Sequence, residues 1–226
     1  MPMSARTRAR VCAVGVVLAS VVVVAPAAPA EGMCRGHVGL TFDDGPGGTT
    51  ADLLDALQRN GLRATMFNQG DHANAHPSLV ESQVDAGMWV GNHSYSHPHM
   101  TQLTRSEVDA EVSRTQRAIT EAGGGTPELF RPPYGETNAL LQEVVASHGL
   151  TEIRWDVDSR DWDGATVDEI VAATAALSDG EVILMHDWPP NTLQAIPGIA
   201  EALRAHDLCP GRISPETGRA VAPDLD

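Results

Sequence analysis

Residues 38–46 of the chain read VGLTFDDGP, and this segment indicates the fold more clearly than any other. Its apolar part, Val38–Phe42, predicts a buried strand, and the polar group Asp43-Asp44-Gly45-Pro46 follows at the end of that strand. An Asp-Gly-Pro sequence is typical of a turn and by itself indicates nothing more. The segment is informative because the same arrangement, an apolar strand-like run that ends in polar side chains, recurs elsewhere in the chain.

Four further segments have this arrangement. They are His93–His97 after Met88–Val90, Arg131–Tyr134 after Leu129–Phe130, Asp158–Trp162 after Glu152–Val157, and His186-Asp187 after Val182–Met185. Helices are predicted between the strands, at 50–60, 77–86, 104–122, 138–148, from Thr166 onward, and at 192–205 with a bend near Pro197. This alternation predicts an α/β fold with a parallel sheet of about seven strands, either closed into a barrel or open and doubly wound. In a barrel the polar strand ends would meet at one site.

The first thirty residues are predicted to be a secretory signal peptide. Three arginines precede the apolar run Val11–Val24, and Ala28-Pro29-Ala30 resembles a cleavage site. The alternative is a membrane anchor, but the apolar run is short for a bilayer span and has no basic residue after it. Residues 31–226 are therefore expected to form one secreted, extracellular catalytic domain that does not associate with a membrane, most simply as a monomer.

The net charge and the cysteines fit that location. The formal charge is −15, and removal of the three signal-peptide arginines would make it −18, which argues against nucleic acid as a partner. Of three cysteines, Cys34 and Cys209 would remain in the mature chain, and an isolated pair outside the cell usually forms a disulfide. In the chain-entropy model a bridge closing so long a loop contributes about 4–5 kcal/mol. The alternative is two free thiols.

The polar segments supply metal ligands. His93 and His97 are four residues apart, a spacing that would place both imidazoles on one side of a helical turn ended by Pro98. Such a pair is often only two surface histidines. Together with one carboxylate of the Asp43-Asp44 pair it would make a three-ligand open site, and the other carboxylate could act as a general base.

The remaining segments offer supporting groups. Arg131, stiffened by two following prolines, is either a surface arginine or an inward one that holds a carboxylate ionised. His186 is either a core histidine or an acid/base group, and Asp161 could keep it protonated. Trp162 is expected to line a sugar-binding groove, as is Trp188, whereas Trp89 and Trp155 are interpreted as packing residues.

These motifs resemble those of the polysaccharide deacetylases, the NodB-homology domain of carbohydrate esterase family four. The similarity includes all five segments and nearly the whole mature chain. The segments 60–70, 155–162 and 214–224 are similar in sequence to secreted streptomycete-type acetylxylan esterases. Met66 and Asn68 differ from the residues that are commoner in the second strand of the family.

The resemblance implies a distorted (β/α) barrel and a divalent metal ion, most often Zn²⁺, with Co²⁺ accepted by some members. Asp44, His93 and His97 would be the metal ligands, and Asp43 the general base toward a water held at the metal. The backbone N–H of Tyr134 would help to hold the oxyanion, and His186 would protonate the leaving sugar atom. The supporting roles would fall to Arg131 orienting Asp43, Asp161 tuning His186, Leu184 shaping the acetyl pocket, and Trp162 beside it.

The predicted function is removal of O-acetyl groups from acetylated xylan. The main alternative is an N-acetylglucosamine deacetylase acting on chitooligosaccharides or peptidoglycan, which would use the same motifs on the same acetyl group. A non-catalytic carbohydrate-binding domain would not need an acid/base pair. A non-haem iron oxygenase also uses two histidines and a carboxylate, but it would not explain Arg131, Asp161 and His186 as a set.

Overall fold

A curled parallel sheet forms the centre of the computed structural model, which describes Met1 and residues 34–223. Seven strands lie in the order β5-β4-β3-β2-β1-β7-β6, and β8 pairs with the beginning of β1. Their bounds are β1 Gly36–Gly45, β2 Thr65–Asn68, β3 Trp89–Asn92, β4 Leu129–Phe130, β5 Thr151–Glu152, β6 Val157–Asp158, β7 Val182–His186 and β8 Leu208–Pro210. The predicted signal peptide lies outside the described residues.

The predicted distorted (β/α) barrel of about seven parallel strands is confirmed. Every pairing within the seven-strand path is parallel. No pairing among the described residues joins β5 to β6, so the barrel stays open at that point. The open doubly wound sheet, with helices on both faces, is not the arrangement that this chain adopts.

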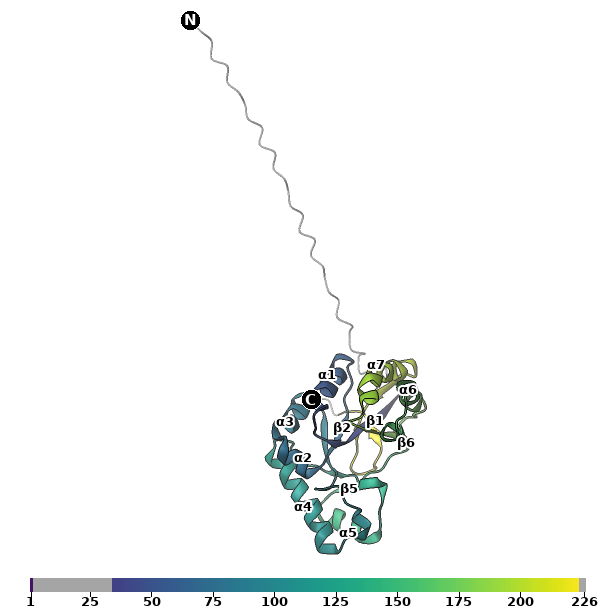
Figure 1. The fold of residues 1–226 in the computed structure, drawn as a ribbon. Helices are drawn as coiled ribbons and strands as arrows, with labels where there is room; N and C mark the ends of the chain where they lie inside the picture. The colour runs from purple at the N-terminus through teal and green to yellow at the C-terminus, as the bar shows by residue number, and fades with distance from the viewer. Residues whose placement is uncertain (2–33, 224–226) are drawn as a thin grey trace. The chain divides into compact units, whose positions relative to one another are not determined.

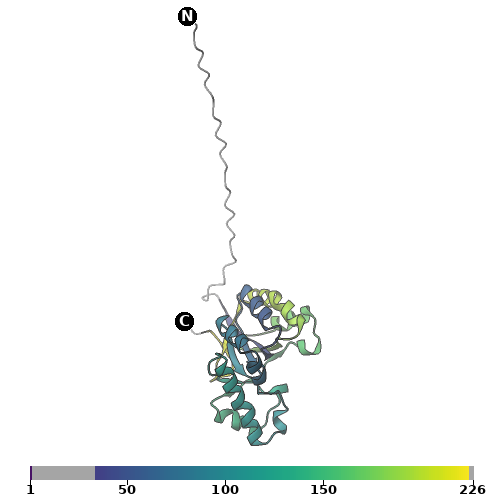
Figure 2. The same ribbon diagram turned by 60° about the vertical axis from the view of Figure 1, so that its left-hand side comes forward.

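The helices follow one another around the outside of the sheet, as Figures 1 and 2 show. They are α1 Thr50–Arg59, α2 Gly70–Ala75, α3 Pro77–Asp85, α4 Arg105–Glu121, α5 Ala139–Ser147, α6 Val167–Ala175 and α7 Pro190–Ala205. Helix α6 packs against α7, α7 against α1, α1 against α3, α3 against α4, and α4 against α5. This sequence of contacts matches the order of the strands from β6 to β5, as expected when each helix covers the strands beside it.

Local sequence signals account for several helix ends. Thr104 and Thr166 each form a capping box with a glutamate three residues later, at the starts of α4 and α6. The side chain of Asn138 caps α5 by accepting a hydrogen bond from the N–H of Leu141. Helix α7 begins at Pro190, two residues before the predicted start, because proline is well tolerated in the first turn of a helix.

Alternation along β1 separates the core from the inner face of the barrel. Leu40 and Phe42 belong to the main apolar cluster, in which they pack with residues of α1, α7 and β7. Thr41 and Asp43 are also buried, but they point the opposite way because successive side chains of a strand alternate between its faces. Asp43 is thereby directed toward the inside of the barrel, at the carboxyl end of the strand.

One predicted strand was wrong in extent. The run Glu152–Val157 was expected to be a single strand, but it forms the ends of two short ones, β5 and β6, which lie at opposite edges of the sheet. The intervening residues, 153–156, cross the open side of the barrel. The apolar pattern could not reveal this break, because a buried crossing segment and a buried strand have similar composition.

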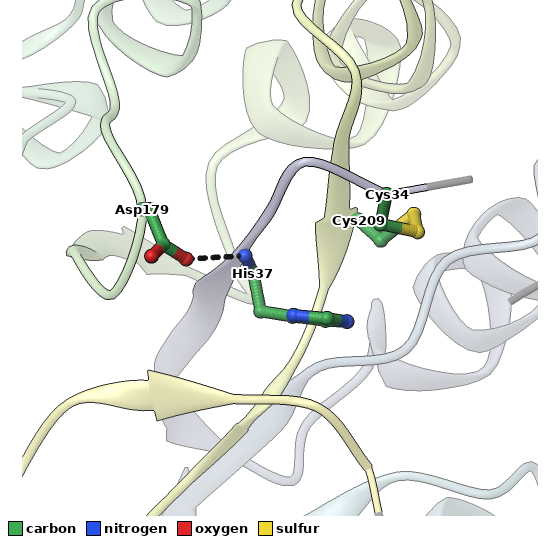
Figure 3. The surroundings of a disulfide bond; sticks show 4 residues. All are labelled: Cys34, His37, Asp179 and Cys209. Atoms are coloured by element: carbon green, nitrogen blue, oxygen red, sulfur yellow. Dashed lines mark hydrogen bonds between the residues drawn. A yellow bond between two sulfur atoms is a disulfide. The ribbon is translucent and has the colours of Figure 1, made fainter. Parts of the chain in front are cut away.

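The two ends of the described chain are tied together. The predicted disulfide between Cys34 and Cys209 is present, with 5.7 Å between the Cα atoms, and it joins the start of β1 to β8 (Figure 3). Close to it, the N–H of His37 donates a 2.8 Å hydrogen bond to Asp179. An antiparallel pair that was not predicted follows, formed by β9 (Arg212–Ile213) and β10 (Ala220–Val221). No helix of the described part is long and apolar enough to cross a membrane.

Candidate active site

The carboxyl ends of the strands surround a cavity of about 430 Å³. Its walls come from all five polar segments, although these are spread over most of the chain. The lining residues are Asp43, Asp44, His93, His97, Pro132, Tyr134, Trp155, Asp158, Trp162, Leu184, His186 and Trp188. Arg131 and Asp161 lie behind this wall, Arg131 in contact with Asp43 and His93 and Asp161 in contact with His186 and Trp162.

Arg131 is fully buried and holds Asp43 from behind. Its Nη1 donates to Asp43 Oδ1 at 2.8 Å and to the hydroxyl of Thr41 at 2.6 Å, and its Nη2 donates to the carbonyl of Arg154 at 3.0 Å. The guanidinium also lies 4.2 Å above the ring of Phe67. Complete burial lowers the pKa of Arg131, against the charge and hydrogen bond of Asp43, which raise it. One oxygen of Asp43 is thus occupied, and Oδ2 remains directed toward His93, 3.7 Å from its Nε2.

Three potential ligand atoms, one each from Asp44, His93 and His97, lie within 4.8 Å of one another. The Oδ1 atom of Asp44 is 3.5 Å from Nε2 of both histidines. Nδ1 of His93 lies 2.8 Å from the carbonyl of Arg131, which fixes Nδ1 as the protonated nitrogen and leaves the Nε2 lone pair for a ligand. One carboxylate and two imidazoles form a donor set suited to a divalent ion such as Zn²⁺.

The expected helical turn at His93–His97 was wrong. This segment is a loop after β3, and the two histidines converge because Ser94 and His97 have φ of 64° and 56°, in the left-handed region. The ring centroids are 5.0 Å apart. Burial and the neighbouring His93 lower the pKa of His97, which favours the neutral imidazole that a metal ligand requires.

Asp44 accepts hydrogen bonds on both carboxylate oxygens. Gln69 Nε2 donates to Oδ1 at 3.0 Å, and Trp188 Nε1 donates to Oδ2 at 3.0 Å. Burial would raise the pKa of Asp44, but His93, His186, His97 and the Trp188 hydrogen bond together lower it below its usual value. The carboxylate is therefore ionised and oriented.

His186 faces the cavity from the end of β7 and is supported by Asp161. Its Nδ1 lies 2.8 Å from Asp161 Oδ1, while Asp161 Oδ2 accepts from the backbone N–H of His186 and from the Thr192 hydroxyl. Burial would lower the pKa of His186, but the hydrogen bond to Asp161 and the charges of Asp43, Asp161 and Asp44 raise it overall. With Nδ1 engaged, Nε2 is the ring atom available to exchange a proton.

The other predicted site residues line the cavity wall. Leu184 lies in the wall and is nearly buried, whereas Trp162 and Tyr134 are exposed. The ring of Tyr134 contacts that of His97 edge-on, with centroids 4.6 Å apart. Its backbone N–H finds no acceptor within the described residues. That N–H is therefore free to donate to a bound molecule.

Backbone strain is concentrated at these segments. Of the six non-glycine residues with positive φ in the described part, five belong to them, and the sixth is Asp207. The five are Asp44, Ser94, His97, Tyr134 and Arg160, with φ between 56° and 71°. Such conformations cost free energy and are retained where the surrounding structure imposes them, often at functional sites.

Some residues of the site were not predicted. Trp155, interpreted as a packing residue, lines the cavity because it lies on the segment that crosses the open side of the barrel. Gln69 donates a hydrogen bond to the carboxylate of Asp44, and Nδ1 of His72 lies 2.8 Å from the backbone carbonyl oxygen of Asp44. Both follow β2, so the rule that strand ends converge would have found them if it had been applied to that strand as well.

Comparisons with known proteins agree with this geometry. Residues 30–153 match the family model described as polysaccharide deacetylase. A family 4 carbohydrate esterase from Streptomyces lividans, solved in complex with acetate, has 68% sequence identity and a TM-score of 0.84. The match covers 84% of this chain and 100% of that one.

Two curated relatives are longer proteins. A bifunctional xylanase/xylan deacetylase of Cellvibrio japonicus is 51% identical over 84% of this chain and 29% of its own length. The peptidoglycan-N-acetylglucosamine deacetylase PgdA of Listeria monocytogenes is 38% identical over 71% of this chain and 34% of its own. The chain thus spans about a third of these relatives. Family model, fold and sequence identity agree, and the chain belongs to the polysaccharide deacetylases of carbohydrate esterase family four.

Proposed function

We propose that residues 31–226 form a secreted, metal-dependent deacetylase that hydrolyses acetyl esters on acetylated xylan. One observation carries this proposal. A carboxylate fixed by a buried arginine, Asp43, and a histidine fixed by a buried carboxylate, His186, line the same cavity as the ligand set Asp44, His93 and His97. This arrangement supports a proton acceptor, a proton donor and a cation site around one cavity.

The metal would be held by Asp44 and by the Nε2 atoms of His93 and His97, most simply as Zn²⁺, with Co²⁺ as a substitute. When bound, such an ion supplies Lewis-acid polarisation of the acetyl carbonyl and of a water molecule. The fit rests on the donor set, because the hydrogen bond from His93 Nδ1 and the lowered pKa of His97 both favour neutral imidazoles.

Asp43 would take the proton of the attacking water. Its Oδ1 is held by Arg131, so only Oδ2 is free, and that oxygen faces the ligand set. A buried ion pair of this kind keeps the carboxylate in one rotamer. The role of Arg131 is therefore to orient the base.

The acetyl group would be held by Tyr134 and Leu184. The unpaired backbone N–H of Tyr134 would donate to the carbonyl oxygen as negative charge develops on it. Leu184 presents an apolar surface to the methyl group, and Trp162 extends the apolar wall toward the sugar.

His186 would protonate the departing sugar oxygen through Nε2. Asp161 keeps the other ring nitrogen engaged and raises the pKa of the imidazole. An elevated pKa keeps the proton on His186 near neutral pH, where a general acid has to carry it.

The preference for xylan is supported by the relatives. The xylan deacetylase relative is 51% identical and the peptidoglycan deacetylase 38% identical. An N-acetylglucosamine deacetylase is the second candidate, since the same acid and base would serve an amide. Acetate release should be measured on acetylated xylan and on chitooligosaccharides, with Zn²⁺ or Co²⁺ added. Faster release from xylan is expected, and release from the amide substrates alone would contradict the proposed substrate.

A non-catalytic carbohydrate-binding protein would release no acetate from either substrate. The double substitution D43N/H186Q is the matched control, because it keeps the size of both side chains and removes the proton acceptor and the proton donor. We expect this variant to be inactive although it is folded. Equal acetate release by the variant and the wild type would exclude the proposed acid/base pair.

The Cys34–Cys209 bridge supports secretion, because such bonds persist in oxidising compartments. The signal peptide stays a prediction, as does the monomeric state. Expression of the full chain in a secreting bacterial host tests the first of these. Mature protein with an N-terminus near residue 31 is expected in the medium, and retention of the intact chain inside the cells would contradict it.

A further inference from the structure

Asp44 presents its two carboxylate oxygens to different neighbours. Oδ1 lies 3.5 Å from Nε2 of both His93 and His97, so this oxygen belongs to the ligand set. Oδ2 is turned away from the histidines and accepts a 3.0 Å hydrogen bond from the indole Nε1 of Trp188. The rotation of the carboxylate about its Cβ–Cγ bond is therefore restrained by two donors, Trp188 at Oδ2 and Gln69, which donates a 3.0 Å hydrogen bond to Oδ1.

Trp188 is itself held in place by its surroundings. It follows His186 by two residues, and their rings lie 5.7 Å apart. The preceding Asp187 is anchored to the start of α1, where the hydroxyls of Thr49 and Thr50 donate to its carbonyl and its carboxylate, each at 2.6 Å. Two prolines follow Trp188 and restrict the backbone on the other side. The indole N–H is thus a fixed donor.

We propose that Trp188 is a positioning residue for the metal site, acting through Asp44. An indole can only donate, so its N–H selects Oδ2 and leaves Oδ1 for the cation. Without this hydrogen bond only the one from Gln69 to Oδ1 would restrain the carboxylate, and its ordering on metal binding would cost more conformational entropy. The inference rests on the proposed function in one respect, namely that Asp44, His93 and His97 bind a divalent ion.

The same cavity contains a matched comparison. Trp162 and Trp188 are both 48% exposed, and both line the cavity. The indole of Trp162 lies 3.3 and 3.4 Å from the oxygens of Asp158, which is outside the ligand set. A tryptophan that served only as an apolar wall for the sugar could be replaced by phenylalanine in either position with the same consequence. The proposal requires the consequences to differ.

The test compares W188F and W162F with the wild type. The metal-free proteins are titrated with Zn²⁺ in competition with a chromogenic chelator, and far-UV circular dichroism verifies the fold. Hydrogen-bond partners of metal ligands typically contribute about 10–100-fold in affinity, and W188F should weaken Zn²⁺ binding by that factor. W162F should bind Zn²⁺ as the wild type does, and its KM for acetylated xylan should rise.

Three results distinguish a failure of the inference about Trp188 from a failure of the proposed function. Zn²⁺ binding by W188F equal to that of the wild type would overturn the inference and leave the proposed function intact. Equal weakening in W188F and W162F would also overturn it, because a general effect of losing an aromatic wall would then suffice. A wild type that binds no Zn²⁺ would remove the proposed function together with the inference.

A second variant guards against a folding defect in W188F. Incorporation of β-(3-benzothienyl)alanine at position 188 replaces the indole N–H by sulfur and keeps the shape of the ring. The same weakening of Zn²⁺ binding is expected from this replacement. Affinity equal to that of the wild type would show that the shape of the side chain, and not its N–H, supports Asp44.

Discussion

Two buried charge pairs lie on different sides of the cavity, and the same kind of carboxylate has a different part in each. In the pair Arg131–Asp43 the carboxylate faces the cavity and the arginine lies behind it. In the pair His186–Asp161 the histidine faces the cavity and the carboxylate lies behind. In each pair a side-chain nitrogen lies 2.8 Å from a carboxylate oxygen, and both carboxylates are almost fully buried.

The partners explain the difference. Arginine keeps its proton at any ordinary pH, so Arg131 can orient Asp43 through a charged hydrogen bond but cannot exchange a proton itself. Histidine titrates near neutral pH, so Asp161 can tune it without taking part in the transfer. We therefore propose that the inward side chain of each pair is the reactive group and that the one behind it is its support.

Removal of the buried arginine should have the largest effect. R131M leaves Asp43 as an unpaired buried charge, which typically costs about 3–5 kcal/mol of unfolding free energy. Acetate release should fall to the background level, because the base loses its orientation. Urea denaturation of the metal-free protein measures the stability change.

The matched control for R131M is R160M. Arg160 also pairs with an aspartate, Asp163, but both side chains are more than half exposed. Exposed pairs contribute about 0–1 kcal/mol, so R160M should denature almost as the wild type does. A similar stability for R131M and R160M would mean that the buried pair does not support Asp43.

Removal of the proposed acid should affect the rate more than the fold. H186Q is expected to lower kcat by about 10²–10⁴, the usual contribution of general acid–base catalysis, with a much smaller loss of stability than in R131M. The control is H148Q, because His148 contacts Asp109 at the same 2.8 Å distance away from the cavity. Unchanged kcat in H186Q would remove His186 from the mechanism.

Removal of the charge on Asp161, which contacts the proposed acid His186, should shift the pH dependence of kcat. The pKa of His186 is raised although burial opposes the shift, and Asp161 contributes through its hydrogen bond and its charge. His186 has to be protonated to act as the acid, so its pKa sets the alkaline limb of the kcat profile. D161N should move that limb to lower pH.

D163N is the control for this shift, since Asp163 is exposed and pairs with Arg160.

The raised pKa of His186 also makes the stability of the folded protein depend on pH. A raised pKa in the folded state stabilises the protein below the unfolded pKa, and this contribution is lost as the pH rises through the folded value. An alkaline limb that stays in place in D161N would contradict the assigned role of Asp161.

Much of the architecture could be predicted from the sequence, because the strands and helices have clear periodicity and caps. The strand Leu129–Phe130 was predicted with its observed ends, and the capping boxes at Thr104 and Thr166 mark the starts of two helices. The error at Glu152–Val157 arose where the chain crosses the open barrel, since nothing in that local pattern distinguishes a crossing from a strand.

Most of the residues that line the site could be predicted from the sequence, but Trp155, Gln69 and the geometry of the site could not. The convergence of strand ends brings Asp43, Asp44 and His186 together. The approach of His93 to His97, however, depends on left-handed backbone conformations that no pattern of residue types encodes. The donor to Asp44 from Trp188 likewise comes from a residue 144 positions away in the chain. Such contacts require the folded structure.

The central claim is that Asp44, His93 and His97 hold a metal ion that the reaction needs. The most direct test is acetate release from acetylated xylan by chelator-treated protein, followed by titration with Zn²⁺. We expect the metal-free protein to be inactive and its activity to return with one equivalent of Zn²⁺. Undiminished acetate release by the metal-free protein would contradict it.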